Sequence, residues 1–214
     1  MPKQQFAHVR AWVFDLDNTL YDPAVRLFDQ IDARITDYVM RLTGLDRDRA
    51  NRMRRRYWME HGTTLAGLMQ GHAVDPDAYM AEVHDVDLSA LAPCAGLRAG
   101  IAALPGRRIV HTNASAPYAR RVLEARGLSD LFDAVYGVEH TGYRPKPKPE
   151  AHEAVLSRDG IAPARAAMFE DDPRNLTVPH ALGMRTVHVA PAAAPAPHIH
   201  HHTDDLAGFL ARLG

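Results

Sequence analysis

Two aspartates, Asp15 and Asp17, follow an apolar run that begins at Ala11 and are separated by a single residue. Residues two apart in an extended segment point the same way, so we expect both carboxylates to face one cleft. There, one carboxylate could act as a nucleophile while the other transfers protons. Like charges this close are tolerated when a cation lies between them or when one carboxylate is protonated. The alternative interpretation is a turn rich in Asp and Asn after a buried strand.

A second polar segment begins at Thr112 and continues with Asn113 and Ser115, directly after the apolar residues of 107–111. A hydroxyl group beside the free backbone N–H groups of a helix start is an arrangement that binds anions such as phosphate. The alternative is that one of these three side chains simply caps the next helix.

In a third segment, Lys146 and Lys148 alternate with prolines. Proline restricts its own backbone and that of the preceding residue. A lysine held in this way can direct its charge at a phosphate or neutralise a neighbouring carboxylate. A solvated, proline-rich turn is the alternative.

Three consecutive acids, Glu170, Asp171 and Asp172, form the fourth segment and follow an apolar run over 166–169. Crowded carboxylates are stable when a cation is present, and carboxylate oxygens are ligands that suit Mg²⁺. The alternative is a helix that begins with acidic residues, which its dipole favours.

The elements that must position these segments alternate along the chain. Strands are predicted at 11–16, 107–111, 133–136, 166–169 and 184–189, and helices at 116–126, 150–158 and about 173–182. This alternation predicts an α/β fold, a Rossmann-like parallel sheet with helices on both faces. Ligands bind such sheets at the carboxyl ends of the strands. Each polar segment follows a predicted parallel strand, so we expect all four to meet at that edge.

Residues 22–92 interrupt the alternation. Apolar residues recur there at helical spacing, as at Leu27, Ile31 and Ile35, and no strand is evident. The stretch is too long for a plain crossover connection. We therefore expect an all-helical domain at 22–92, inserted into an α/β domain made of 1–21 and 93–214. A last helix is expected at 204–213, with Thr203 as its N-cap.

The composition narrows the class of protein. The chain has 214 residues, 46% hydrophobic and 24% charged, which is typical of a globular protein. Lys and Arg number 25 against 26 Asp and Glu, so the basic excess of a general nucleic-acid binder is missing. The single cysteine excludes an internal disulfide and fits a reducing compartment. No apolar run is long enough to span a membrane, and residues 1–10 lack the apolar core of a secretory signal, so we expect a cytoplasmic protein.

Taken in order, the four segments resemble the haloacid dehalogenase (HAD) superfamily. Its Asp-x-Asp-x-Thr motif, Ser/Thr, Lys and acidic cluster correspond to Asp15/Asp17/Thr19, Thr112, Lys146 and Asp171. The helical insert resembles the cap domain of that superfamily. More narrowly, FDLDNTLY, YWMEHGTTLAGLM and FEDDPRNL are similar to its pyrimidine 5′-nucleotidase-like branch.

The resemblance implies roles for these residues. The implied catalytic residues are Asp15, Asp17, Thr112 and Lys146. The implied substrate-binding residues are Thr112, Asn113 and Lys146. The implied Mg²⁺ ligands are Asp15, the backbone carbonyl of Asp17, and Asp171. Glu170 and Asn175 stand where the superfamily often has other acids, so they are given at most a water-mediated role, and Asp172 is an alternative ligand. Asn18 replaces a more common glycine.

The function implied is a Mg²⁺-dependent phosphomonoester hydrolase that works through an aspartyl-phosphate and acts on small metabolites. Nucleoside 5′-monophosphates, pyrimidine ones first, are the preferred substrates. Asp17 favours a phosphatase, because the dehalogenase branch lacks this second acid. A sugar-phosphate phosphatase or a phosphomutase remains open, as does a signalling module similar to a response-regulator receiver domain. We expect a monomer or homodimer with no nucleic-acid or membrane partner.

Other residues are given mostly structural roles. The basic run Arg52, Arg54, Arg55 and Arg56 is interpreted as a solvated helix face, with one arginine reaching the substrate as the minority alternative. Tyr57 and Trp58 are interpreted as core or interdomain contacts, with stacking on a pyrimidine left open. His198, His200, His201 and His202 are predicted to lie in a surface loop. Cys94 is predicted to be a small buried residue.

Overall fold

The sheet domain is built on six parallel strands. The computed structural model describes residues 2–213, with side chains from residue 3 onward. The strands are β1 (Ala11–Phe14), β2 (Arg107–His111), β3 (Ala134–Tyr136), β4 (Ala166–Glu170), β5 (Arg185–Val189) and β6 (His201–Thr203). Their order in the sheet is β3-β2-β1-β4-β5-β6, and every neighbouring pair is parallel. This confirms the predicted α/β class, and the five predicted strands lie within two residues of their expected bounds.

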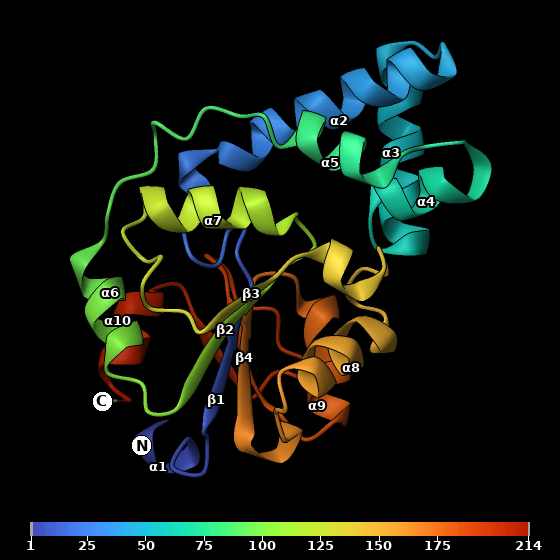
Figure 1. The fold of residues 1–214 in the computed structure, drawn as a ribbon. Helices are drawn as coiled ribbons and strands as arrows, with labels where there is room; N and C mark the ends of the chain where they lie inside the picture. The colour runs from blue at the N-terminus through green and yellow to red at the C-terminus, as the bar shows by residue number, and fades with distance from the viewer. Residues whose placement is uncertain (1, 214) are drawn as a thin grey trace.

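Helices cover both faces of the sheet (Figure 1). They are α6 (Ala95–Ala102), α7 (Ala116–Ala125) and α10 (Leu206–Ala211) on one face, and α8 (Pro149–Arg158) and α9 (Thr177–Ala181) on the other. Alternation along β1 sends Trp12 and Phe14 into the core of the first face and Val13 into that of the second. Phe14 stacks on Phe169 of β4, with ring centroids 4.7 Å apart. Both faces of the sheet are therefore buried, which fixes the strand ends in space.

Four helices occupy the insert: α2 (Leu27–Thr43), α3 (Arg47–His61), α4 (Thr64–Gly71) and α5 (Pro76–Val83). They have a small apolar core of their own, which includes Val39, Leu68 and Tyr79. At Gly67 a Cβ atom would lie 2.3 Å from Tyr57, so only glycine lets α4 pack this closely on α3. The described part of 22–92 contains no strand, as expected. That this segment forms a domain separate from 1–21 and 93–214 stays a prediction.

Four predictions outside the insert were wrong. His201–Thr203 forms β6, paired with β5, where a surface loop was expected; a three-residue strand is too short to show a period of two. Thr203 ends this strand, and the last helix is capped by Asp205, whose carboxylate accepts from Gly208 N. Cys94 is half-buried at the start of α6. The 3₁₀ turn η4 (Pro173–Leu176) precedes α9, where a single helix was expected.

Among residues 2–213, no helix combines the length and apolar character needed to cross a membrane.

Candidate active site

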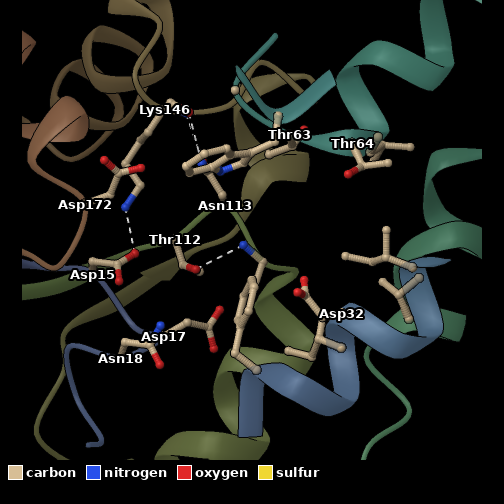
Figure 2. A pocket seen from close by; sticks show the side chains of 18 of the residues that line it. Asp15, Asp17, Asn18, Asp32, Thr63, Thr64, Thr112, Asn113, Lys146 and Asp172 are labelled. Carbon is tan, nitrogen blue, oxygen red and sulfur yellow. Dashed lines mark hydrogen bonds and ion pairs between the residues drawn. The ribbon is translucent and has the colours of Figure 1, made fainter. Parts of the chain in front are cut away.

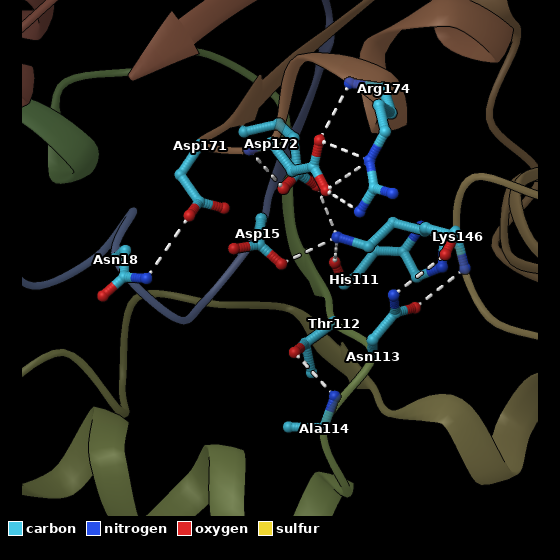
Figure 3. A network of polar contacts seen from close by, with 11 residues as sticks. Asp15, Asn18, His111, Thr112, Asn113, Ala114, Lys146, Asp171, Asp172 and Arg174 are labelled. Atoms are coloured by element: carbon cyan, nitrogen blue, oxygen red, sulfur yellow. Dashed lines mark hydrogen bonds and ion pairs between the residues drawn. The ribbon is translucent and has the colours of Figure 1, made fainter. Parts of the chain in front are cut away.

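The four polar segments meet at the carboxyl edge of the sheet around Lys146 (Figure 3). Its Nζ donates to Asp15 Oδ1 at 2.7 Å, to Glu170 Oε2 at 2.6 Å and to the carbonyl of His111 at 3.0 Å. The lysine is only 1% exposed. Burial alone would lower its pKa, but the carboxylates of Asp15 and Glu170 raise it above the usual value, so the ammonium is retained.

Asn113 holds the backbone that carries this lysine. Its Oδ1 accepts from Lys146 N at 2.8 Å, and its Nδ2 donates to Lys146 O at 3.0 Å. The insert also contacts this loop, because Gly62 lies so close to Lys146 O that a Cβ would approach it to 2.8 Å. Asn113 lines the cavity, but its amide is engaged with the protein backbone, which indicates a positioning role beside the predicted substrate-binding one.

Three carboxylates form a cluster that fits a hard metal ion. Asp15, Glu170 and Asp171 each place an oxygen within 4.8 Å of the others. Burial, together with the neighbouring carboxylates, raises the pKa of Asp15 and of Asp171 to about 7 and that of Glu170 to about 8. One ammonium therefore does not offset the crowded negative charge. The oxygen donors and the excess charge both suit Mg²⁺.

Glu170 is the residue of this cluster whose role the sequence left open. Glu170 is 1% exposed and is itself a member of the cluster. Its Oε2 accepts from Lys146, and its Oε1 accepts from Asp172 N at 3.2 Å. Asn18 Nδ2 donates to Asp171 Oδ2 at 3.4 Å. Asn18 has a φ of +58°, a conformation that asparagine tolerates better than most residues, which explains how it replaces a glycine.

Asp172 lies outside the carboxylate cluster among the residues described. Its side chain accepts from Arg174, with Nη2 at 2.6 Å from Oδ2 and the backbone N at 3.0 Å from Oδ1. The Arg174 guanidinium lies over the Trp58 ring of α3, 3.6 Å from its centroid. The Asp172–Arg174 pair thus connects the sheet edge with the insert, and Trp58 makes the contact between the two parts that was one of its predicted roles.

Asp17 is held by two tyrosines for which no role was predicted. The hydroxyls of Tyr21 and Tyr118 both donate to Asp17 Oδ1, at 2.8 and 2.9 Å. Burial and the nearby Asp15 raise the pKa of Asp17 to about 6, a value suited to a group that both gives and takes protons near neutral pH. Tyr118 lies 101 residues from Asp17, so no local pattern could have found it.

Thr112 stands beside the start of α7. Its Oγ1 accepts from Ala114 N at 3.0 Å, so its own hydrogen is available for a second partner. Ser115 occupies the N-cap position of α7 without a side-chain cap bond; instead, Glu139 Oε1 accepts from Ala116 N at 2.9 Å. Capping of this helix therefore does not explain the polar residues after β2.

A cavity of about 680 Å³ lies between this edge and the insert (Figure 2). All the predicted site residues line it: Asp15, Asp17, Thr112, Asn113, Lys146 and Asp171. The insert contributes an apolar wall that includes Ile31, Leu65 and Met80, and it also contributes Arg54. Arg54 is 16% exposed and ion-paired with Asp32, so the interpretation of the basic run as a solvated face was wrong at this position.

Comparison with known proteins agrees with this geometry. A family described as haloacid dehalogenase-like hydrolase matches residues 9–183, and the chain belongs to this family of hydrolases. Phosphate metabolism protein 8 of Saccharomyces cerevisiae is 27% identical over 198 residues, which cover 84% of this chain; the chain spans 60% of the length of that relative.

Solved structures share the fold. The HAD phosphatase from Thermococcus onnurineus matches with a TM-score of 0.64 at 17% identity, over 96% of this chain and 98% of that one. The magnesium-bound HAD-hydrolase YfnB from Bacillus subtilis matches with a TM-score of 0.61 at 16% identity, over the same shares.

The strand order argues against the receiver-like signalling module. β1 lies between β2 and β4, which is the Rossmann order. The flavodoxin-like order of receiver domains instead places the first strand between the second and the third.

Proposed function

We propose that this hydrolase cleaves phosphate monoesters of small metabolites through a phosphorylated aspartate. The observation that carries the proposal is the placement of two buried carboxylates, Asp15 and Asp17, in one cavity with the ammonium of Lys146. The Lys146 ammonium donates to one oxygen of Asp15, whereas the hydroxyls of two tyrosines donate to one oxygen of Asp17. These surroundings suit a nucleophile and a proton-transfer group, respectively.

In the first half of the reaction, an Asp15 oxygen attacks phosphorus and a new O–P bond forms as the bond to the leaving oxygen breaks. Asp17 donates its proton to that oxygen, so the alcohol leaves neutral. Lys146 stabilises the negative charge that develops on the phosphoryl group, and Thr112 donates a hydrogen bond to one of its oxygens.

In the second half, water attacks the phosphorus of the aspartyl-phosphate and Asp17 takes the proton from that water. The Asp15–phosphorus bond breaks and releases inorganic phosphate. Asp17 is then protonated and Asp15 is free, which restores the starting state. The pKa of about 6 at Asp17 suits both the acid and the base step.

We propose Mg²⁺ as the cofactor, held by Asp15, the backbone carbonyl of Asp17, and Asp171, with Glu170 close enough to contribute. When bound, such an ion screens the anionic nucleophile from the anionic substrate and stabilises transferred charge. The carboxylate cluster supports this assignment, as does the magnesium in the structure of YfnB.

The preferred substrates remain nucleoside 5′-monophosphates, pyrimidine ones first. A cavity of about 680 Å³ with an apolar wall could hold such a leaving group. Residues 22–92 would act as a cap domain that closes over the site and excludes water. Sugar-phosphate hydrolysis and a phosphomutase reaction are the alternatives. A cytoplasmic location and a monomeric or homodimeric state remain part of the proposal.

The test is phosphate release from nucleotides, sugar phosphates and p-nitrophenyl phosphate, measured with Mg²⁺ and with EDTA. We expect Mg²⁺-dependent release, fastest with pyrimidine nucleotides. Turnover that is insensitive to EDTA would contradict the metal assignment. Conversion of one sugar phosphate into an isomer without phosphate release would favour the mutase.

Metal binding should be visible without turnover. Mg²⁺ at 100 times its dissociation constant is expected to stabilise the fold by about 2.7 kcal/mol, a melting-temperature rise of roughly 5–10 °C. Asp171→Asn should remove most of this rise, because it takes a charge from the cluster. Asp172→Asn is the matched control, since its carboxylate pairs with Arg174, and it should retain the rise. The opposite pattern would make Asp172 the ligand.

The tyrosines that hold Asp17 should matter most for poor leaving groups. Tyr118→Phe and Tyr21→Phe each remove one hydrogen bond to Asp17 Oδ1 and so misplace the acid. We expect kcat/KM for uridine 5′-monophosphate to fall about 10-fold or more, and kcat/KM for p-nitrophenyl phosphate, whose phenolate needs little protonation, to change far less.

A matched control for these variants is Tyr136→Phe, because the Tyr136 hydroxyl donates to Asp159 and lies outside the cavity. This variant should retain both activities. Equal losses for the two esters in Tyr118→Phe would show that the tyrosine acts on folding and not on proton transfer.

A further inference from the structure

One charged pair lies on the insert's side of the cavity, away from the reacting groups. Asp32 on α2 accepts two parallel hydrogen bonds from Arg54 on α3, each of 2.7 Å and one to each carboxylate oxygen. Arg54 Nε donates in turn to Asn51 Oδ1 at 3.0 Å. Such a two-pronged contact fixes the carboxylate in both position and orientation.

The two partners differ in how far they face the cavity. The Arg54 side chain is 16% exposed and that of Asp32 is 38% exposed, although both line the cavity. Figure 2 shows Asp32 on α2, across the cavity from Asp15. A carboxylate has about four acceptor positions, and Arg54 uses only one on each oxygen. Asp32 therefore keeps acceptor positions for a bound molecule.

The surroundings of Asp32 determine what it could accept. Ile31, Ile35 and Met80 belong to the same cavity wall, so a ligand group that reaches Asp32 must also present an apolar face. A ligand that covers the acceptor positions of Asp32 left free by Arg54, without donating to them, binds poorly, and a negative charge placed against this carboxylate is repelled.

We propose that Asp32, held in place by Arg54, selects the leaving group of the substrate. It accepts a hydrogen bond from an N–H or O–H of leaving groups that have an apolar face, and it excludes leaving groups that carry a second anion. This inference rests on the proposed phosphatase function and adds a specificity-determining residue to it. Asp32 does not touch the reacting atoms.

The test compares Asp32→Asn with the wild-type chain on three esters. Uridine 5′-monophosphate has a leaving group rich in donors, α-naphthyl phosphate has a flat apolar one without donors, and phosphoglycolate has one with a carboxylate. We expect kcat/KM to fall about 10- to 100-fold for the first, to change less than about threefold for the second and to rise for the third.

Asp37→Asn is the matched control, because Asp37 lies on the same helix and pairs with Arg47 at the surface. It should leave all three values unchanged. Arg54→Lys keeps the charge but loses the two-pronged contact, so it should lower the selectivity for uridine 5′-monophosphate over α-naphthyl phosphate. If circular dichroism shows that Asp32→Asn does not fold, the selectivity of Arg54→Lys tests the proposal in its place.

Equal losses on uridine 5′-monophosphate and α-naphthyl phosphate would overturn the proposal, because they would show that the pair only supports the fold of the insert. Unchanged selectivity would also overturn it. A wild-type chain that hydrolyses none of the three esters would instead refute the proposed phosphatase function, and the selectivity proposal with it.

Discussion

Replacing Asp15 with Asn is expected to abolish phosphate release, with a loss of about 10⁴-fold or more, because the amide cannot form the phosphorylated intermediate. The side chain is buried, with one oxygen 2.7 Å from Lys146 Nζ. The substitution keeps its size and removes a carboxylate whose pKa is raised by burial to about 7. The variant should therefore fold as well as the wild-type chain.

Phosphate release and the melting temperature, measured on the same preparation, check this expectation. Asp37→Asn again serves as a control, since it removes one surface carboxylate without touching the cavity. Substantial turnover by a folded Asp15→Asn variant would refute the assignment of the nucleophile.

Lys146→Met is expected to damage both stability and activity. The ammonium is the common partner of Asp15 and Glu170, and all three side chains are buried. Removing one partner of a buried ion pair leaves charge without compensation, which typically costs about 3–5 kcal/mol. Phosphate release should fall as well, because positive charge at the transferred group is lost.

The control for this variant is Lys148→Met, two residues further along the same proline-rich loop and outside the set of residues that line the cavity. Urea unfolding and phosphate release should show a large effect at Lys146 and a small one at Lys148. Equal effects at the two lysines would contradict the specific role of Lys146, and a larger effect at Lys148 would reverse the assignment.

The convergence of the site could be predicted because strand ends carry it. Each of the segments at Asp15, Thr112 and Asp171 directly follows an apolar run, and parallel strands bring their carboxyl ends to one edge. Lys146 needed more than this rule, since it lies ten residues after the last residue of β3; the order of the motifs in the resembled superfamily placed it. The sheet class followed from the same alternation.

The parts that could not be predicted are those made by packing between distant segments. Tyr118 reaches Asp17 across 101 residues, and Arg54 reaches Asp32 only because α2 and α3 pack side by side. A basic run shows how many charges a helix carries, but not which one its neighbours bury. β6 was missed for a different reason, because three residues carry too little pattern.

The most direct measurement of the central claim is chemical trapping of the intermediate. The chain is mixed with a phosphate monoester and Mg²⁺, quenched during turnover and treated with borohydride, which reduces an aspartyl-phosphate to homoserine. Peptide mass spectrometry then locates the change. The proposed mechanism predicts homoserine at position 15 and none in Asp15→Asn. Reduction at another carboxylate, or turnover with Asp15 unmodified throughout, would contradict it.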